Sequence, residues 1–229
     1  MSIQTVVHSD EKWLKIEHVD HMRPFFMSIV SNSNHWMFIS SNGGLSAGRK
    51  NAEFSLFPYY TDDKITEFAS FTGNKTVIKV LKSGKSEIWE AFNPHAVPSD
   101  NIERNLYKNI LGNKIRFEET NYALGLRYSY EWNNTQQYGF VKKSKLENLT
   151  DASIDVEILD GIQNLLPYGV NSDLQNRSSN LVDAYKRQEL MPASGLAVYA
   201  LSAFIVDKAE PSESLKANVA WSYGLGEET

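Results

Sequence analysis

Short segments in which apolar and polar residues alternate run along most of this chain. From Leu124 to Trp132 every second residue is Leu, Tyr or Trp, and the residues between them are Gly, Arg, Ser and Glu. In an extended strand, a period of two places all the large side chains on one face. The alternation therefore predicts a strand with one apolar face.

Turn residues separate these segments at regular intervals. Residues 76–81 and 87–92 flank a Lys-Ser-Gly-Lys turn, and residues 105–110 and 114–121 flank a Gly-Asn turn, so both pairs are predicted hairpins. Further strands are predicted over 140–149, after a polar turn at Asn133-Asn134-Thr135, and over 154–158, 195–206 and 214–223. Turn signals about every 8 to 12 residues are typical of a β-sandwich. We predict an all-β, mainly antiparallel sandwich.

One segment has helical rather than strand periodicity. Between Ser172 and Glu189 apolar residues recur at helical spacing, Asp173 lies in the first turn, and Lys186 and Arg187 lie in the last, as the helix dipole favours. We expect one long helix lying across the sandwich. The chain contains neither an internal repeat nor a Pro- or Ser-rich linker, so residues 1–229 are predicted to form a single domain.

Composition excludes several classes of protein. The net charge is −5 and the basic residues form no block, which argues against a nucleic acid or an anionic membrane as the partner. The chain contains no cysteine, which excludes disulfides, thiol catalysis and zinc–thiolate sites. It has no apolar stretch of membrane-spanning length, and its N-terminal residues do not form a secretory signal. These features favour the cytoplasm.

Residues 36–65 combine a Gly-rich turn with polar and aromatic side chains. The segment 41–49, Ser-Asn-Gly-Gly-Leu-Ser-Ala-Gly-Arg, lacks the Lys-Ser/Thr pair of a phosphate-binding loop. One interpretation is a turn that needs positive φ at Gly43 or Gly44. The other is a loop that presents backbone N–H groups, Asn42 and Arg49 to a partner domain or a glycan.

Aromatic residues and acids of the same chain allow similar alternatives. Tyr59, Tyr168 and several tryptophans could stack on sugar rings, but for any single ring a place in the sandwich core is the favoured interpretation. Asp62 and Asp63 could act as paired carboxylates, although a cap for a helix starting near Lys64 is favoured for one of them.

Three residues near the N-terminus raise the possibility of a metal site. His18, Asp20 and His21 are metal-ligating types, but His18 and His21 would face opposite sides of a strand, and no further ligand lies close in sequence. We therefore predict no metal and no cofactor.

Six segments together resemble the N-terminal domain of the cellobiose and chitobiose phosphorylase family of glycoside phosphorylases. The two most specific are SSNGGLSAGRKNAEFSLFPYYTDDKI (40–65) and ILDGIQNLLPYGV (158–170), and the others lie at 117–132, 138–148, 179–190 and 209–225. The resemblance covers nearly the whole chain. It implies a galactose-mutarotase-like β-sandwich that is followed, in the parent protein, by a helical linker and an (α/α)6 barrel.

In that family the barrel carries the catalytic acid and most of the sugar and phosphate contacts. No position of this chain matches that acid, so the resemblance implies an accessory domain without a complete active site, from a parent that acts on an oligosaccharide. It also implies interdomain and dimer contacts. The strand-like run that stops shortly before Thr229 leads us to expect a fragment of a longer protein.

We expect sugar or interdomain contacts at Asn42, Arg49, Tyr59 and Asp62, with a second patch at Tyr168 and Asn171. Arg49 suits bidentate hydrogen bonding to a carboxylate. Two alternatives stay open: a stand-alone sugar-binding module, and an enzyme resembling a mutarotase, which would need a His and a Glu on one concave face.

Overall fold

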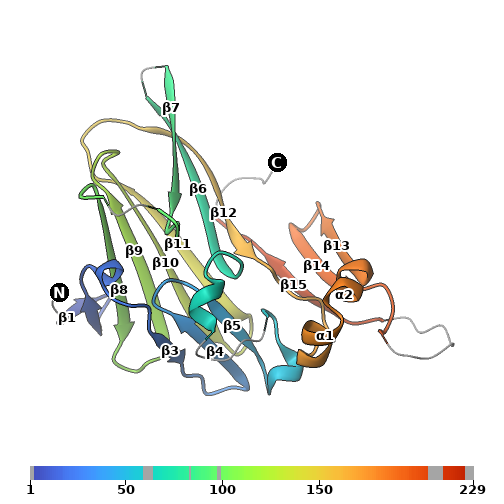
Figure 1. Ribbon diagram of the computed structural model, residues 1–229. Coiled ribbons are helices and arrows are strands. Elements are labelled where there is room, and N and C mark those ends of the chain that lie inside the picture. Colours follow the sequence, from blue (N-terminus) through green and yellow to red (C-terminus); the bar gives the residue numbers. More distant parts are fainter. Residues whose placement is uncertain (1–2, 59–63, 83, 97–98, 206–213, 225–229) are drawn as a thin grey trace.

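The computed structural model describes residues 3–58, 64–82, 84–96, 99–205 and 214–224. Its strands form antiparallel sheets throughout (Figure 1). The largest sheet has six strands in the order β1-β2-β8-β9-β10-β11. Its strands are β1 Ile3–His8, β2 Glu11–Ile16, β8 Ile102–Asn109, β9 Lys114–Asn121, β10 Leu126–Thr135 and β11 Gly139–Asn148.

Two three-stranded sheets form the second layer. One has the order β12-β6-β7 and the other β3-β4-β5. Their strands are β3 Phe26–Ile29, β4 His35–Ser40, β5 Leu45–Arg49, β6 Gly73–Lys82, β7 Lys85–Ala91 and β12 Asp155–Gln163. The 3-10 helices are η1 Val19–His21, η2 Ala52–Phe54 and η3 Ile65–Phe68.

The alternation in β10 explains how the layers meet. Tyr128 and Trp132 project from the same face of this strand. The Tyr128 hydroxyl hydrogen-bonds Thr76 of β6 at 2.8 Å, and the Trp132 ring lies edge-on to Phe57, just after β5, at 6.2 Å. Both small sheets therefore pack on one face of the large sheet, and all three contribute to one hydrophobic core. The predicted all-β antiparallel sandwich is confirmed.

The C-terminal part of the chain forms a smaller unit beside the sandwich (Figure 1). A third three-stranded sheet, in the order β13-β14-β15, lies next to two short helices. Its own hydrophobic cluster contains Leu166, Val170, Val182 and Leu201. The elements are α1 Ser172–Arg177, α2 Ser179–Tyr185, β13 Lys186–Met191, β14 Leu196–Leu201 and β15 Ala217–Trp221.

The prediction of one long helix over 172–189 is wrong. Ser178 has φ −139° and ψ 35°, outside the helical region, and it separates α1 from α2. Beyond Tyr185 the backbone is extended, and residues 186–191 pair with residues 196–201. Ladder hydrogen bonds in the sheet here outweigh the helical pattern of the side chains.

The predicted turn at Asn133-Asn134-Thr135 is also wrong. These residues continue β10 and pair with Val141, Phe140 and Gly139 of β11. The turn falls at residues 136–138, where the Tyr138 N–H donates to the Thr135 Oγ1 at 2.9 Å. Both predicted hairpins are confirmed in their strands, β6 with β7 and β8 with β9.

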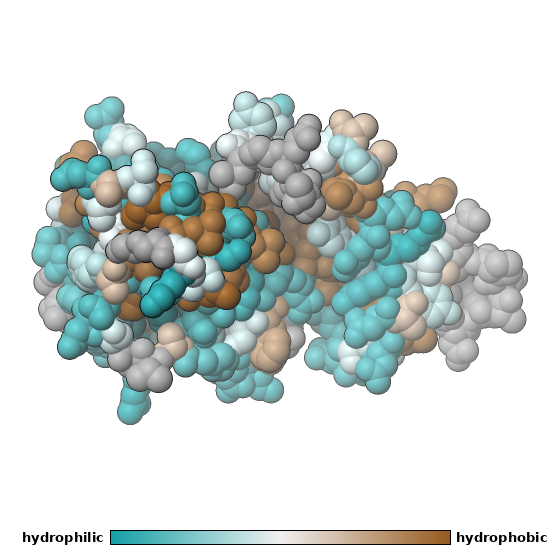
Figure 2. Space-filling model, turned by 90° about the horizontal axis from the view of Figure 1, so that it is seen from above, coloured by the Kyte–Doolittle hydropathy of each residue, from teal (hydrophilic) through white to brown (hydrophobic). Residues whose placement is uncertain are grey.

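The end of the sandwich that carries the β6–β7 turn exposes hydrophobic side chains. Figure 2 looks onto this end and shows apolar residues gathered within a hydrophilic surround. Leu81, Ile88 and Val156 lie in the paired parts of β6, β7 and β12 nearest this turn, and all three are exposed.

Candidate functional site

A groove of about 220 Å³ lies between the sandwich and the C-terminal sheet. We call it the Arg49 groove. Its polar residues come from three separate parts of the chain: the open end of the β4–β5 hairpin with the segment that follows it, the loop before α1, and β15. It is lined by Asn34, Arg49, Lys50, Phe54, Ser55, Leu56, Tyr168, Gly169 and Asn218.

Backbone pairing positions the sandwich wall of the groove. His35 pairs with Arg49 at the open end of the β4–β5 hairpin, and the Lys50 N–H donates to the Asn34 carbonyl at 2.7 Å. The Asn51 side chain then accepts the Glu53 N–H at 3.1 Å and caps η2. This cap is the reason that η2 begins directly after the hairpin and places Phe54 at the groove.

The opposite wall is tied to the sandwich by long-range hydrogen bonds. The Leu166 N–H donates to the Leu56 carbonyl at 2.8 Å, and the Asn218 Nδ2 donates to the Leu166 carbonyl at 2.9 Å. The hydroxyl of Ser172 bonds Glu53 at 3.2 Å. The loop before α1 is therefore held on two sides, which fixes Tyr168 opposite Arg49.

The groove is rich in positive charge. Arg49 is exposed and donates through Nε to the Asn34 Oδ1 at 3.1 Å, and within the described parts of the chain its two terminal nitrogens make no hydrogen bond. Lys50 lies over the Phe54 ring at 5.2 Å, and Lys216 lies over the Tyr168 ring at 5.3 Å. Two cations, Arg49 and Lys50, thus line the groove, and a third, Lys216, lies over one of the rings that line it.

His35 lies behind Arg49 and is affected by it. Its Nδ1 hydrogen-bonds Ser33 Oγ at 2.5 Å, and its ring packs edge-on against Phe140. Burial, and to a smaller extent the charge of Arg49, hold the pKa of His35 below its ordinary value. The groove therefore favours a neutral imidazole behind its guanidinium.

The structure brings together only part of the predicted site. Arg49 and Tyr168, predicted as members of two separate patches, line the same groove. Asn42 lies elsewhere, where its Nδ2 donates to the Thr66 carbonyl at 2.9 Å and its Oδ1 accepts from Ser40. Asn171 caps α1 by accepting the Leu174 N–H at 2.9 Å. Tyr59 and Asp62 lie outside the described residues.

Backbone conformation and close packing explain the glycines of the Gly-rich turn. Gly43 has φ +93°, as one interpretation of the segment expected, and a Cβ on Gly44 would come within 2.1 Å of the Ile65 carbonyl. The helix after this segment begins at Ile65, and its capping position is Lys64 rather than an aspartate. Of the candidate stacking rings, Trp89 and Trp132 are buried in the core, and Tyr168 is half-buried.

Among the groove residues that sequence analysis missed are Asn34, Lys50 and Asn218. Lys50 follows Arg49 directly and has φ +60°, but a positive φ outside glycine leaves no mark in a sequence. Asn34 lies beside the β4–β5 hairpin and Asn218 lies in β15, and the two parts of the chain meet through the hydrogen bonds of Leu166 with Leu56 and Asn218. Their place in the groove depends on tertiary contacts, which leave no pattern in the sequence.

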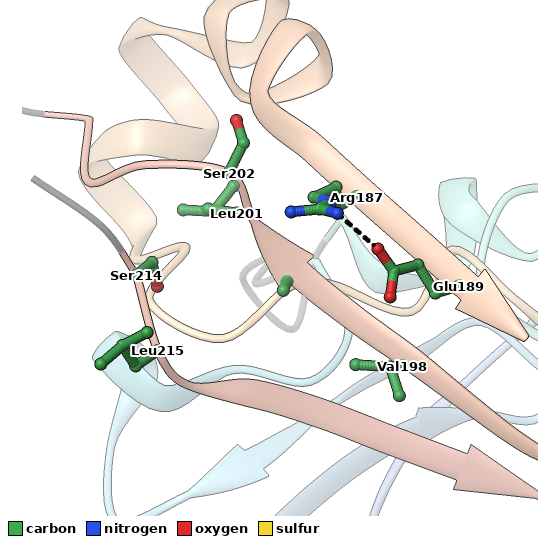
Figure 3. Close-up of a pocket in the computed structure, with 8 residues that line it drawn as sticks. Arg187, Glu189, Val198, Leu201, Ser202, Ser214 and Leu215 are labelled. Carbon is green, nitrogen blue, oxygen red and sulfur yellow. Dashed lines mark ion pairs between the residues drawn. The ribbon is translucent and has the colours of Figure 1, made fainter. Parts of the chain in front are cut away.

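A second hollow, of about 320 Å³, lies on the C-terminal sheet (Figure 3). Arg187 and Glu189 of β13 form an ion pair of 2.7 Å at its wall, and Leu201 and Leu215 contribute apolar surface. The Ser214 hydroxyl oxygen is buried without a hydrogen-bond partner in the described residues. The paired charges leave this hollow without the free cations of the Arg49 groove.

One buried carboxylate, Glu119, and one partly buried carboxylate, Asp160, are held within the sandwich. Glu119 accepts hydrogen bonds from Trp89 Nε1 and Arg104 Nε, both at 2.6 Å, and from the Phe92 N–H at 2.9 Å. Asp160 bonds Lys142 and Tyr128, both at 2.7 Å. All of these partners are themselves residues of the sandwich. The two acids therefore link its layers.

The expectation that His18 and His21 face opposite sides is wrong. The two residues lie around η1, a 3-10 turn rather than a strand, and their rings stack with centroids 5.3 Å apart. A 3-10 helix has three residues per turn, so side chains three apart lie on the same side.

Comparison with known proteins assigns the chain to no family. No protein-family model matches the chain, and no curated protein matches it significantly in sequence. Within the described residues, none of the helices has the length and apolar character needed to cross a membrane.

Proposed function

We propose that this chain is an accessory, non-catalytic β-sandwich of a carbohydrate-active protein that resembles the cellobiose phosphorylases. In this proposal the Arg49 groove contacts acidic side chains of a neighbouring domain, the (α/α)6 barrel of the parent chain. The galactose-mutarotase-like topology and the cytoplasmic location belong to the same proposal. The observation that carries it is the pair of cations, Arg49 and Lys50, that lines one hollow, with the terminal nitrogens of Arg49 free of described partners.

The chemistry of the groove favours a carboxylate over a neutral sugar. Guanidinium and carboxylate groups form paired, charge-assisted hydrogen bonds, which are stronger than neutral ones. Stacking of a pyranose needs an open aromatic face, but Lys216 lies over Tyr168 and Lys50 lies over Phe54. A sugar would first have to displace these lysines.

Exposed hydrophobic residues on the adjoining sheet support a contact with another protein surface. Leu190 of β13 and both Val219 and Trp221 of β15 are about half exposed. Val219 and Trp221 lie on one face of this sheet, and Leu190 lies on the other face, which also carries Asn218 of the groove. Exposed apolar side chains of this size are typical of surfaces that bind another protein.

The test is charge reversal in the product of the complete reading frame. Arg49→Glu is expected to loosen the contact, so limited proteolysis should release the sandwich faster than from the wild type. The matched control is Arg177→Glu, because Arg177 is an exposed arginine on α1 that does not line the groove. Equal cleavage of the two variants, or a reading frame that encodes no further domain, would refute the proposal.

The stand-alone sugar-binding module is tested with this chain alone. We expect flat calorimetric titrations with gluco- and chito-oligosaccharides, because a lysine lies over each aromatic ring of the groove and competes with a sugar for it. Saturable binding that Tyr168→Ala abolishes would replace the interdomain proposal with the sugar-binding one.

A further inference from the structure

A cluster of metal-ligating side chains lies at η1, which follows β2 of the six-stranded sheet, and none of its residues lines the Arg49 groove. His18, Asp20 and His21 each offer one ligand atom, and these atoms lie within 4.8 Å of one another. The His21 Nε2 and the Asp20 Oδ2 are 3.8 Å apart. We propose that these three residues bind a late first-row divalent metal ion, with Zn²⁺ as the reference ion.

The ligand types fit this class of ion. Imidazole nitrogens and one carboxylate suit zinc and nickel, whereas magnesium prefers oxygen ligands alone. Bonds of about 2.0–2.2 Å in a tetrahedral site place ligand atoms roughly 3.3 Å from each other. The three side chains therefore need to close by about 1.5 Å or less, and water would fill the remaining position.

The turn that carries the cluster is fixed by the fold. Val19 lies in the main hydrophobic core, and the His21 N–H donates to the His18 carbonyl at 3.0 Å. The His18 N–H also bonds the buried side chain of Asn105 at 3.3 Å. His18 is therefore held at φ +52°, which presents its ring beside that of His21.

An outer carboxylate adds negative potential to the cluster. Glu103 of β8 accepts from the Asn105 Nδ2 at 2.7 Å and also from the Tyr122 hydroxyl. Glu103 shares no hydrogen bond with His18 in the described structure, so it acts on the cluster through its charge alone. The nearby Lys15 is paired with Glu17 at 3.0 Å, which offsets part of its repulsion of a cation.

The experiment is a calorimetric titration of the untagged chain with Zn²⁺ and Ni²⁺, with Mg²⁺ as the comparison ion. We expect one saturable Zn²⁺ site, with Mg²⁺ silent. His21→Ala and Asp20→Asn should each weaken binding by about tenfold or more, since loss of an outer partner alone costs 10–100-fold. The matched control is His8→Ala, because His8 is an exposed histidine on β1 outside the cluster.

Equal Zn²⁺ affinity in the wild type and His21→Ala, or no saturable binding in the wild type, would overturn the proposal. A measurement on the wild type alone keeps the test independent of how the variants fold. Substoichiometric Ni²⁺ should first broaden the amide resonances of residues 18–22 in an NMR spectrum. Broadening centred on any other segment would contradict the site.

Discussion

Removing the charge of Glu119 should destabilise the sandwich more than any surface change. Glu119 is 1% exposed, and its carboxylate accepts three hydrogen bonds, from Trp89 of β7, from the Phe92 backbone and from Arg104 of β8. In Glu119→Gln the side chain keeps its shape, but its NH₂ group must face at least one of these donors. One buried donor then loses its acceptor, and Arg104 loses its counterion.

The magnitude follows from these two losses. A buried donor without an acceptor costs about 1–3 kcal/mol, and breaking a buried ion pair costs about 3–5 kcal/mol. The Arg104 side chain is 19% exposed and regains some solvation, so we expect a total near 3 kcal/mol. For a chain of this length that corresponds to a fall in Tm of about 6–12 °C.

The assay is thermal unfolding followed by circular dichroism, together with urea unfolding followed by tryptophan fluorescence. The matched control is Glu157→Gln, which breaks an exposed pair with Lys79 at 3.0 Å. We expect the control to change stability by about 0–1 kcal/mol. If Glu119→Gln lowered Tm by no more than the control, Glu119 would not tie the layers together.

Three further predictions follow from the same structure. Burial opposes ionisation of Asp160, but the charge and hydrogen bond of its lysine partner outweigh it and hold its pKa below the usual value. Its ionised form therefore stabilises the fold above about pH 4. The difference in the free energy of unfolding between wild type and Asp160→Asn should narrow as pH falls below that value. A constant difference from pH 7 to pH 3 would contradict this. In Arg49→Ala the pKa of His35, followed by NMR titration, should rise but stay below the ordinary value, because burial is the larger cause; an unchanged pKa would show that the two groups do not interact. Gly44→Ala should lower Tm by several degrees because its Cβ would meet a backbone carbonyl at 2.1 Å, whereas Gly161→Ala has open space and should not; equal melting of the two variants would argue against the close approach.

The sandwich was predictable because its signals are local. Alternation along β10 places Tyr128, Tyr130 and Trp132 on one face, and a face of that size must be buried. Where two patterns competed locally, the prediction failed. Residues 186–191 have a helical arrangement of charges, but their pairing with β14 decides their conformation, and pairing depends on a strand that follows later.

The Arg49 groove was predictable only in part, for a related reason. Arg49 and Tyr168 could each be selected for their chemistry, because a guanidinium and an aromatic ring serve recognition in many contexts. Their meeting depends on the bond between the Leu166 N–H and the Leu56 carbonyl. Backbone groups are the same in every residue, so no sequence pattern marks that bond.

The histidine turn shows how one spacing can support opposite predictions. Residues three apart face opposite sides of a strand but the same side of a 3-10 turn. Two contacts select the 3-10 turn over the strand. Val19 is buried in the core, and the His18 N–H donates to Asn105, which lies on a strand far along the chain. Replacing Asn105 with Ala should therefore separate the two imidazole rings and weaken Zn²⁺ binding, although Asn105 is not a ligand. Unchanged Zn²⁺ affinity in that variant would show that the turn holds its shape without this bond.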